Sequence, residues 1–281
     1  MNTKAQVLFL SHGGGPMPLL DDEAHQEMVD CLQSIAAEIT KPSAIIVISA
    51  HWEEKMVTVT AAPEPPLIYD YYGFPQESYD IAYPCPGEPV LAEQVQIVMQ
   101  AAGIAVKLDE HRGFDHGLYV PLKIMFPGAD IPCIQLSLVN SLDPSEHLDI
   151  GRALQGLDYE NLLVIGSGFS FHNMKAFFAP VTSDSRAMNV SFEDWLVDTC
   201  CSPEMTEENR GKRLIQWEKA PAARFCHPRE EHLLPLHVCY GLAGTACSAS
   251  FRLQVLNRES SMYLWSPPGD NVFGFNQKHL Y

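Results

Sequence analysis

Short apolar runs alternate along this chain with segments of helical spacing. Four runs are bounded by turn formers and have the length of strands that are buried on both faces. They are residues 5–10, 44–49, 131–138 and 161–166. The segments with helical spacing are residues 21–39, 89–102, 116–125 and 144–157. This alternation predicts an α/β fold in which a mainly parallel central sheet is flanked by helices.

The length and the charge of the chain limit the number of domains and the kinds of partner that we expect. A chain of 281 residues without a repeat or an evident boundary predicts a single catalytic domain over residues 1–281. The formal net charge of −17 repels phosphates and anionic lipids, so we expect neither nucleic acid nor a membrane as a partner. It also makes a strongly anionic substrate less attractive, although Arg112 and Arg229 lie near the motifs described below.

The eight cysteines are scattered, and several lie in apolar surroundings without a CxxC pair. Scattered apolar cysteines are typical of reduced core thiols. The N-terminal segment has neither the apolar length nor the cleavage-site pattern of a signal peptide. We therefore predict a cytoplasmic protein in which all eight thiols are reduced.

The stretch from residue 61 to residue 87 is rich in Pro, Tyr and Gly and is too long for an ordinary turn. Long loops in compact domains are usually functional or disordered, and the many aromatic residues argue against disorder. We predict an ordered lid or pocket wall. A packed surface loop is the alternative.

Three predicted strands are followed closely by a histidine: His12, His51 and His172 come after the runs at 5–10, 44–49 and 161–166. Ligands of open α/β sheets bind beyond the carboxyl ends of the strands. A single histidine there is more often structural, but three neutral imidazoles at one edge suit a divalent metal. The glycines at 13–15 allow a sharp turn beside His12. A phosphate cradle is a weaker alternative, because the chain lacks the GK[ST] ending of a P-loop.

Two further histidines lie where a turn meets a predicted helix. His116 begins the helical segment at 116–125, and His232 precedes an apolar helix that runs toward Leu242. Glu230 and Glu231 are possible alternative ligands or carboxylates favoured by the helix dipole. The remaining histidines with no local pattern are predicted to pack or to lie at the surface. His237 is predicted to pack, and the predicted surface residues are His25, His111, His147 and His279.

Five short motifs carry a family resemblance. The segments at 10–17, 49–52, 113–117, 171–173 and 231–236 read LSHGGGPM, SAHW, GFDHG, FHN and EHLLPL. In this order they resemble the LigB-like class III extradiol ring-cleavage dioxygenases, most closely the DOPA 4,5-dioxygenase branch. The resemblance implies a non-haem iron enzyme that opens the ring of a small catechol beside its two hydroxyls with O₂.

The resemblance also implies roles for individual residues. His12, His51 and His232 match the metal ligands, and His172 matches a catalytic base that can come close enough to be a fourth ligand. His116 matches a second catalytic histidine of the pocket. Other class III enzymes supply a carboxylate where this chain has His232. Fe(II) is expected for activity, but an all-histidine set also suits Zn(II), which can occupy the site.

Two other functions remain open on the sequence. A zinc hydrolase could use the histidines with Glu230 or Glu231 as the base for cleavage of an amide or ester. A non-catalytic metal-binding or signalling protein could also use this scaffold. The preferred catechol and the oligomeric state cannot be read from the sequence.

Overall fold

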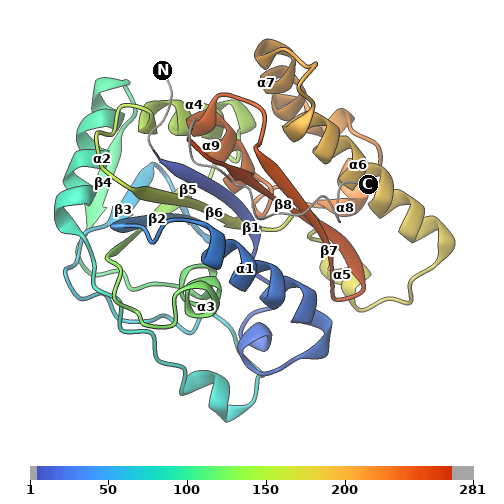
Figure 1. Ribbon diagram of the computed structural model, residues 1–281, viewed down its shortest axis with the longest axis horizontal. Coiled ribbons are helices and arrows are strands. Elements are labelled where there is room, and N and C mark those ends of the chain that lie inside the picture. The colour runs from blue at the N-terminus through green and yellow to red at the C-terminus, as the bar shows by residue number, and fades with distance from the viewer. Residues whose placement is uncertain (1–4, 268–281) are drawn as a thin grey trace.

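One sheet runs through the computed structural model, which describes residues 5–267. Eight strands of this described part form it in the order β4-β3-β5-β2-β6-β1-β8-β7 (Figure 1). Their bounds are β1 Gln6–Ser11, β2 Ala44–Glu54, β3 Val57–Thr60, β4 Val106–Asp109, β5 Cys133–Val139, β6 Leu162–Gly168, β7 Ala249–Val255 and β8 Arg258–Trp265.

The four predicted strands are the middle of this sheet. Strands β5, β2, β6 and β1 pair side by side in parallel. The strands outside this group were not predicted. At one end β8 and β7 add an antiparallel hairpin, and at the other end β3 pairs antiparallel with β5 and parallel with β4. These outer strands carry polar residues such as those in Val57–Thr60, so they lack the continuous apolar run that marks the middle.

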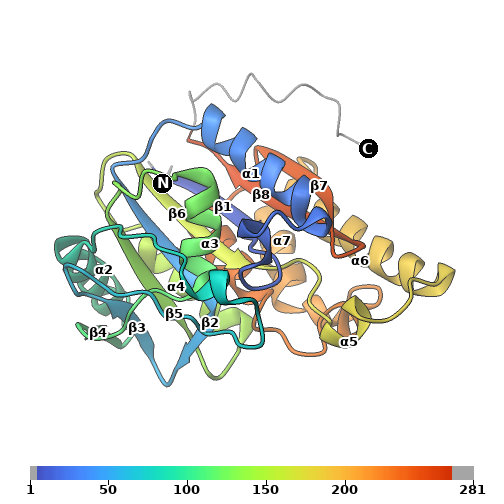
Figure 2. The same cartoon turned by 90° about the horizontal axis from the view of Figure 1, so that it is seen from below.

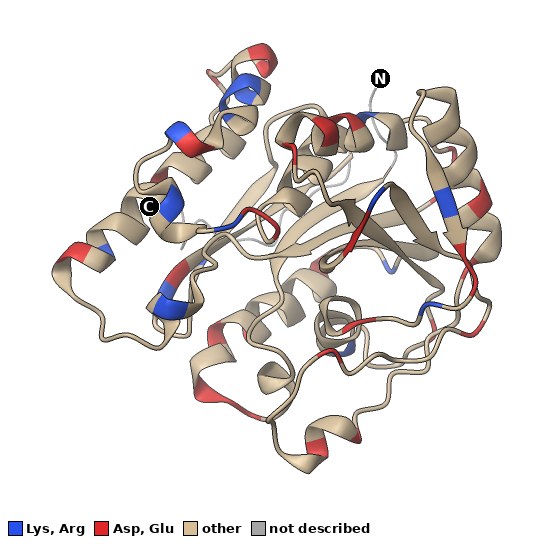
Figure 3. Ribbon diagram, turned by 180° about the vertical axis from the view of Figure 1, so that it is seen from behind, with Lys and Arg blue, Asp and Glu red and all other residues tan. Residues whose placement is uncertain are grey.

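Both faces of the middle strands are covered. In β1, Val7 and Phe9 point into one apolar core, whereas Leu8 and Leu10 point into the other. Because successive side chains of a strand point to opposite faces, a strand buried on both sides is mainly apolar along its whole length. The charged residues lie mainly on the outer helices and loops (Figure 3). This single α/β domain confirms the predicted fold class.

Helices cover the two faces unequally. Helices α2, α4, α6 and α9 pack on one core, and α1 and α3 pack on the other (Figures 1 and 2). The helix bounds are α1 Gln26–Glu38, α2 Pro89–Ala101, α3 His116–Met125, α4 Pro144–Leu154, α5 Met174–Phe177, α6 Ser183–Cys201, α7 Glu207–Ile215, α8 Ala223–Cys226 and α9 Leu234–Ala243. Short 3₁₀ turns are η1 Met17–Leu19, η2 Glu23–His25, η3 Gln76–Tyr79 and η4 Trp217–Lys219. In the described residues no helix has the length and apolarity to cross a membrane.

The predicted helix at 21–39 starts later than expected. Asp21 has a φ of 53°, in the left-handed region that L-residues rarely adopt, and the turn η2 precedes α1. The other three predicted helices are confirmed, with α4 ending at Leu154 rather than at residue 157.

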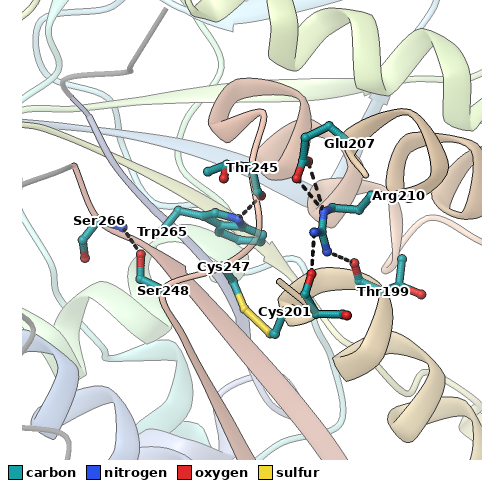
Figure 4. Close-up of a disulfide and its surroundings, with 10 residues drawn as sticks. Thr199, Cys201, Glu207, Arg210, Thr245, Cys247, Ser248, Trp265 and Ser266 are labelled. Carbon is teal, nitrogen blue, oxygen red and sulfur yellow. Dashed lines mark hydrogen bonds and ion pairs between the residues drawn. A yellow bond between two sulfur atoms is a disulfide. The ribbon is translucent and has the colours of Figure 1, made fainter. Parts of the chain in front are cut away.

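The prediction that all eight cysteines are reduced is wrong for two of them. Cys201 at the end of α6 and Cys247 just before β7 form a disulfide (Figure 4). They are 46 residues apart, and the backbone bond from Cys247 N to Cys200 O brings the two segments together. No local sequence pattern reveals such a pair. The other six cysteines are free, and the cytoplasmic location stays a prediction.

Candidate active site

His12 lies where β1 ends. Its backbone N–H donates to Gly168 O at the end of the neighbouring strand β6 (3.2 Å). Gly13, with a φ of 84°, then turns the chain, and a Cβ there would lie 2.6 Å from the ring of Pro18. Only glycine fits such a turn without strain, as the sequence predicts.

His51 lies inside β2 rather than after it. The strand was expected to end at residue 49, but it continues to Glu54 with a register shift between Ile48 and Glu53. A local shift of this kind redirects side chains, and such irregularities are frequent next to active sites. It brings the His51 ring to the ring of His12 at the same edge of the sheet.

His116 is the first residue of α3, and two carboxylates fix this helix start. Buried Asp115 caps the helix by accepting a hydrogen bond from Gly117 N (3.0 Å), and burial raises the pKa of its carboxyl group. Asp70 accepts from both His116 Nδ1 (2.8 Å) and His116 N (3.0 Å). With Nδ1 engaged by Asp70, Nε2 is the nitrogen of His116 that is left for another partner.

His172 and His232 come from the loop after β6 and the turn before α9. Their rings are stacked, with centroids 3.4 Å apart. Glu231 Oε1 lies 2.9 Å from His232 Nδ1 and 3.4 Å from His172 Nδ1. The carbonyl of His232 accepts from Phe169 N, and a Cβ on Gly168 would lie 2.2 Å from that carbonyl oxygen. Glycine therefore permits the close approach of the two segments.

The histidine rings converge. Nε2 of His12 and Nε2 of His51 are 2.9 Å apart, and the centroid of the His232 ring lies 5.3 Å and 4.9 Å from those of His12 and His51. The Ser167 hydroxyl donates its one hydrogen to Gly117 O, so it must accept from Nδ1–H of His12. Nε2 of His12 therefore carries the lone pair.

Burial keeps three of these histidines neutral. Desolvation, followed by the neighbouring histidines, lowers the pKa of His12 and of His51 well below the usual value. Burial, with His172 as the next cause, lowers the pKa of His232 to about 3. All three are therefore neutral at pH 7, which is the form of imidazole that binds metals.

The donor set fits a divalent metal ion. Two imidazole nitrogens 2.9 Å apart can share one ion at metal–nitrogen distances of ~2.0–2.1 Å. Within the described residues, two groups have ligand atoms no more than 4.8 Å apart. They are His12 with His51 and His116, and Glu231 with His172 and His232. The predicted set of His12, His51 and His232 takes members from both groups.

All five histidines line one cavity of about 480 Å³. Most of its wall is apolar or aromatic, and two pairs of neighbouring rings, Phe169 with Phe177 and Tyr71 with Phe74, line it. Tyr71 and Phe74 belong to the loop at 61–87, so this loop is the predicted pocket wall. Its other aromatic residues do not line the cavity, and Tyr72 is 89% exposed.

Two histidines predicted for the surface are buried. His25 Nδ1 lies 2.6 Å from Asp22 Oδ2, and His147 Nε2 accepts from Val139 N (3.1 Å). Each ring accepts a hydrogen bond from a backbone N–H of a turn or strand. No local sequence pattern predicts such a bond. His111 is exposed and His237 packs between two backbone carbonyls, as predicted. His279 lies outside the described residues.

The sequence did not single out the residues that hold the histidines. Asp70 and Ser167 were missed, and Glu231 was noted only as an alternative ligand or base. A carboxylate or hydroxyl behind a metal-binding histidine is common, but the contact spans distant parts of the chain. His12 and Ser167, for example, are 155 residues apart.

Comparison with known proteins assigns the family. The family model described as the catalytic LigB subunit of aromatic ring-opening dioxygenase matches residues 6–263. "Dioxygenase tasH" of Hapsidospora irregularis is 39% identical over 256 residues, covering 85% of this chain and 78% of the relative. "4,5-DOPA dioxygenase extradiol" of Beta vulgaris is 39% identical over 243 residues, covering 85% of this chain and 87% of the relative.

A relative from a bacterium and a solved structure agree with this. "4,5-DOPA dioxygenase extradiol" of Escherichia coli (strain K12) is 35% identical, covering 84% of each chain. The crystal structure of an uncharacterised protein from Escherichia coli K12 matches with a TM-score of 0.71 and 27% identity, covering 93% of this chain and all of the other. The chain therefore belongs to the LigB family of aromatic ring-opening dioxygenases.

Proposed function

We propose that this protein is an iron-dependent extradiol dioxygenase that opens catechols with a DOPA-like side chain, and that residues 1–281 form one catalytic domain. The observation that carries the proposal is the convergence of five histidines in one aromatic cavity. A flat aromatic ring fits against aromatic walls, and neutral imidazoles in the same cavity suit a metal. Homologues named as DOPA extradiol dioxygenases support the substrate class.

We propose His12, His51 and His232 as the metal ligands. Each is neutral at pH 7, and Nδ1 of both His12 and His232 is engaged by another side chain, which leaves Nε2 for the ion. His116 is the competing third ligand because its nitrogen lies near those of His12 and His51. Metal analysis distinguishes the two sets: His232→Ala should lose the ion and His116→Ala should keep it. The opposite result would exchange the two roles.

The bound Fe(II) would supply a redox-active centre at which catechol and O₂ meet. His172 would accept a proton from a catechol hydroxyl, because its ring stacks on that of His232 and faces the cavity. General base catalysis of this kind is worth ~10²–10⁴-fold in rate. Glu231 beside both rings would hold the proton on His172 Nδ1 and leave Nε2 as the acceptor.

His116 would contact a substrate hydroxyl or oxygen through Nε2, with Asp70 fixing its orientation. The Phe and Tyr side chains would exclude water from the ring. The product expected from a simple catechol is a yellow muconic semialdehyde, which can cyclise where the substrate carries an amine.

The identity of the metal is tested by oxygen uptake. Protein loaded anaerobically with Fe(II) should consume O₂ with DOPA or 4-methylcatechol, whereas the zinc form should not, because Zn(II) has no accessible redox state. Equal oxygen uptake with both metals would contradict the proposed iron dependence. Hydrolysis of an amide or ester by the zinc form, without oxygen uptake by the iron form, would favour the zinc hydrolase. A protein that binds either ion but turns over no catechol would be a metal-binding member of the family without this activity.

A further inference from the structure

The cavity holds a charged residue that the proposed reaction does not use. Asp22 lines the same cavity as the five histidines, and its side chain is 25% exposed. It belongs to the turn before η2, whereas the histidines lie at the sheet edge. Asp22 is the one carboxylate among the described residues that line the cavity. Such a group is a strong feature for recognition, because a charge that is partly removed from water favours an opposite charge as its partner.

Asp22 is held in place through His25. Gly14 N donates to Nε2 of His25 (2.9 Å), so the ring proton is on Nδ1 and is donated to Oδ2 of Asp22 (2.6 Å). His25 is buried, and burial lowers its pKa, so this bond has a neutral donor. Oδ1 of Asp22 has no hydrogen bond to any residue between 5 and 267. His25 thus holds Oδ2 of Asp22 in place, and Oδ1 is free to accept a hydrogen bond.

The tip of the β7–β8 hairpin forms the neighbouring wall. Leu256 and Asn257 line the cavity with φ values of 50° and 62°. Asn tolerates this region, but Leu adopts it only where other contacts hold it, and such strain is concentrated at functional sites. Leu256 N donates to Ala24 O (3.0 Å), which ties the hairpin tip to the turn that carries Asp22. The carboxylate, the amide and an apolar side chain therefore line neighbouring parts of the cavity wall that this bond ties together.

The charges around the cavity favour a cation at this end. Arg112 pairs with Asp115 and lies over the ring of Trp52, and Arg229 pairs with Glu53 and Glu231. Neither arginine lines the cavity, nor does any lysine or other arginine of the described chain. The whole chain has a formal charge of −17, which attracts cations.

We infer that Asp22, Asn257 and Leu256 form a subsite for the side chain of the substrate, and that among catechols with a DOPA-like side chain this subsite favours those that end in an ammonium group without a carboxylate. The inference rests on the proposed function. With the ring at the histidines, the ammonium would donate to Oδ1 of Asp22 and the methylene groups would pack on Leu256. A carboxylate on the same side chain would meet Asp22 with no described cation to balance it.

The inference is tested with four catechols on the Fe(II) enzyme: dopamine, DOPA, 3-(3,4-dihydroxyphenyl)propionate and 4-methylcatechol. We expect kcat/KM to fall in the order dopamine, DOPA, propionate, with dopamine at least about tenfold above the propionate, the usual scale of one charge-assisted contact. Cleavage of 4-methylcatechol with no preference for the amine would overturn the subsite alone. Failure of all four catechols would instead overturn the proposed function.

A matched pair of variants assigns the preference to Asp22. Asp22→Asn keeps an oxygen for the His25 bond and removes the charge, so the ratio of kcat/KM for dopamine to that for 4-methylcatechol should fall about tenfold. A purely structural role would lower both values together and leave the ratio unchanged, which would overturn the assignment. Asp21→Asn is the control, because the neighbouring Asp21 is exposed and does not line the cavity. It should leave the ratio as it is.

Discussion

Glu231 is the carboxylate that joins the proposed ligand His232 to the proposed base His172. Burial alone would raise its pKa, but hydrogen bonds from the two histidines lower it below the usual value, so the group is charged at pH 7. Replacing it with alanine removes the acceptor that orients His232 Nδ1 (2.9 Å) and leaves the ligand free to rotate or to change tautomer. Loss of such an outer partner typically costs ~10–100-fold in metal affinity. That factor corresponds to ~1.4–2.8 kcal/mol of binding free energy.

The assay is a competition for one metal ion between the protein and a chelator of known affinity. Glu230→Ala is the control, because the side chain of the adjacent Glu230 pairs with Arg224 (2.7 Å). We expect Glu231→Ala to bind the metal ~10–100-fold more weakly than Glu230→Ala does. Equal affinities in the two variants would refute the reasoning that Glu231 orients the metal ligand.

Three further outcomes follow from the structure. His172→Ala should still bind about one metal ion per chain but lose ~10²–10⁴-fold in turnover, as measured by metal analysis and oxygen uptake; a metal-free variant would make His172 a ligand. Asp115→Ala should lower the free energy of unfolding, measured in urea, by ~2–3 kcal/mol, because this helix cap is buried and also pairs with Arg112. The control is Asp143→Ala at an exposed helix cap, for which the expected loss is ~1 kcal/mol. Equal losses in the two variants would contradict this. Burial lowers the pKa of His237 to about 4 in the folded protein. Because the unfolded chain therefore binds a proton at this histidine at higher pH than the folded protein does, the free energy of unfolding falls as the pH drops from 6.5 toward 4. The expected loss from this group is ~2 kcal/mol at pH 5. In metal-free protein, His237→Gln should flatten this dependence by that amount, and an unchanged slope would show that the group does not contribute.

The middle of the fold and the histidine cluster could be predicted because they depend on local pattern. A strand buried on both faces is apolar throughout, as residues 44–48 of β2 are, and the end of each parallel strand lies at one edge. His12 and His51 were therefore expected to meet, and their Nε2 atoms do meet, at 2.9 Å.

The supporting contacts could not be predicted because they join distant segments. Asp70 reaches His116 across 46 residues, and the disulfide of Cys201 with Cys247 also spans 46 residues. The continuation of β2 past residue 49 depends on a register shift that pairs Glu53 with β5. The position of His25 beside the cavity depends on its hydrogen bonds to Asp22 and Gly14. Only the tertiary structure fixes such pairings.

The central claim is that the histidine cluster directs both atoms of O₂ into an opened catechol ring. Mass spectrometry of the product from 4-methylcatechol tests it most directly, since this substrate has no amine and its product does not cyclise. With Fe(II) enzyme in ¹⁸O₂, the account predicts a yellow product whose mass is that of the catechol plus one O₂ molecule, with label in its new carboxylate. A product that carries a single oxygen from O₂ with the ring intact, or oxygen from water alone, would contradict it.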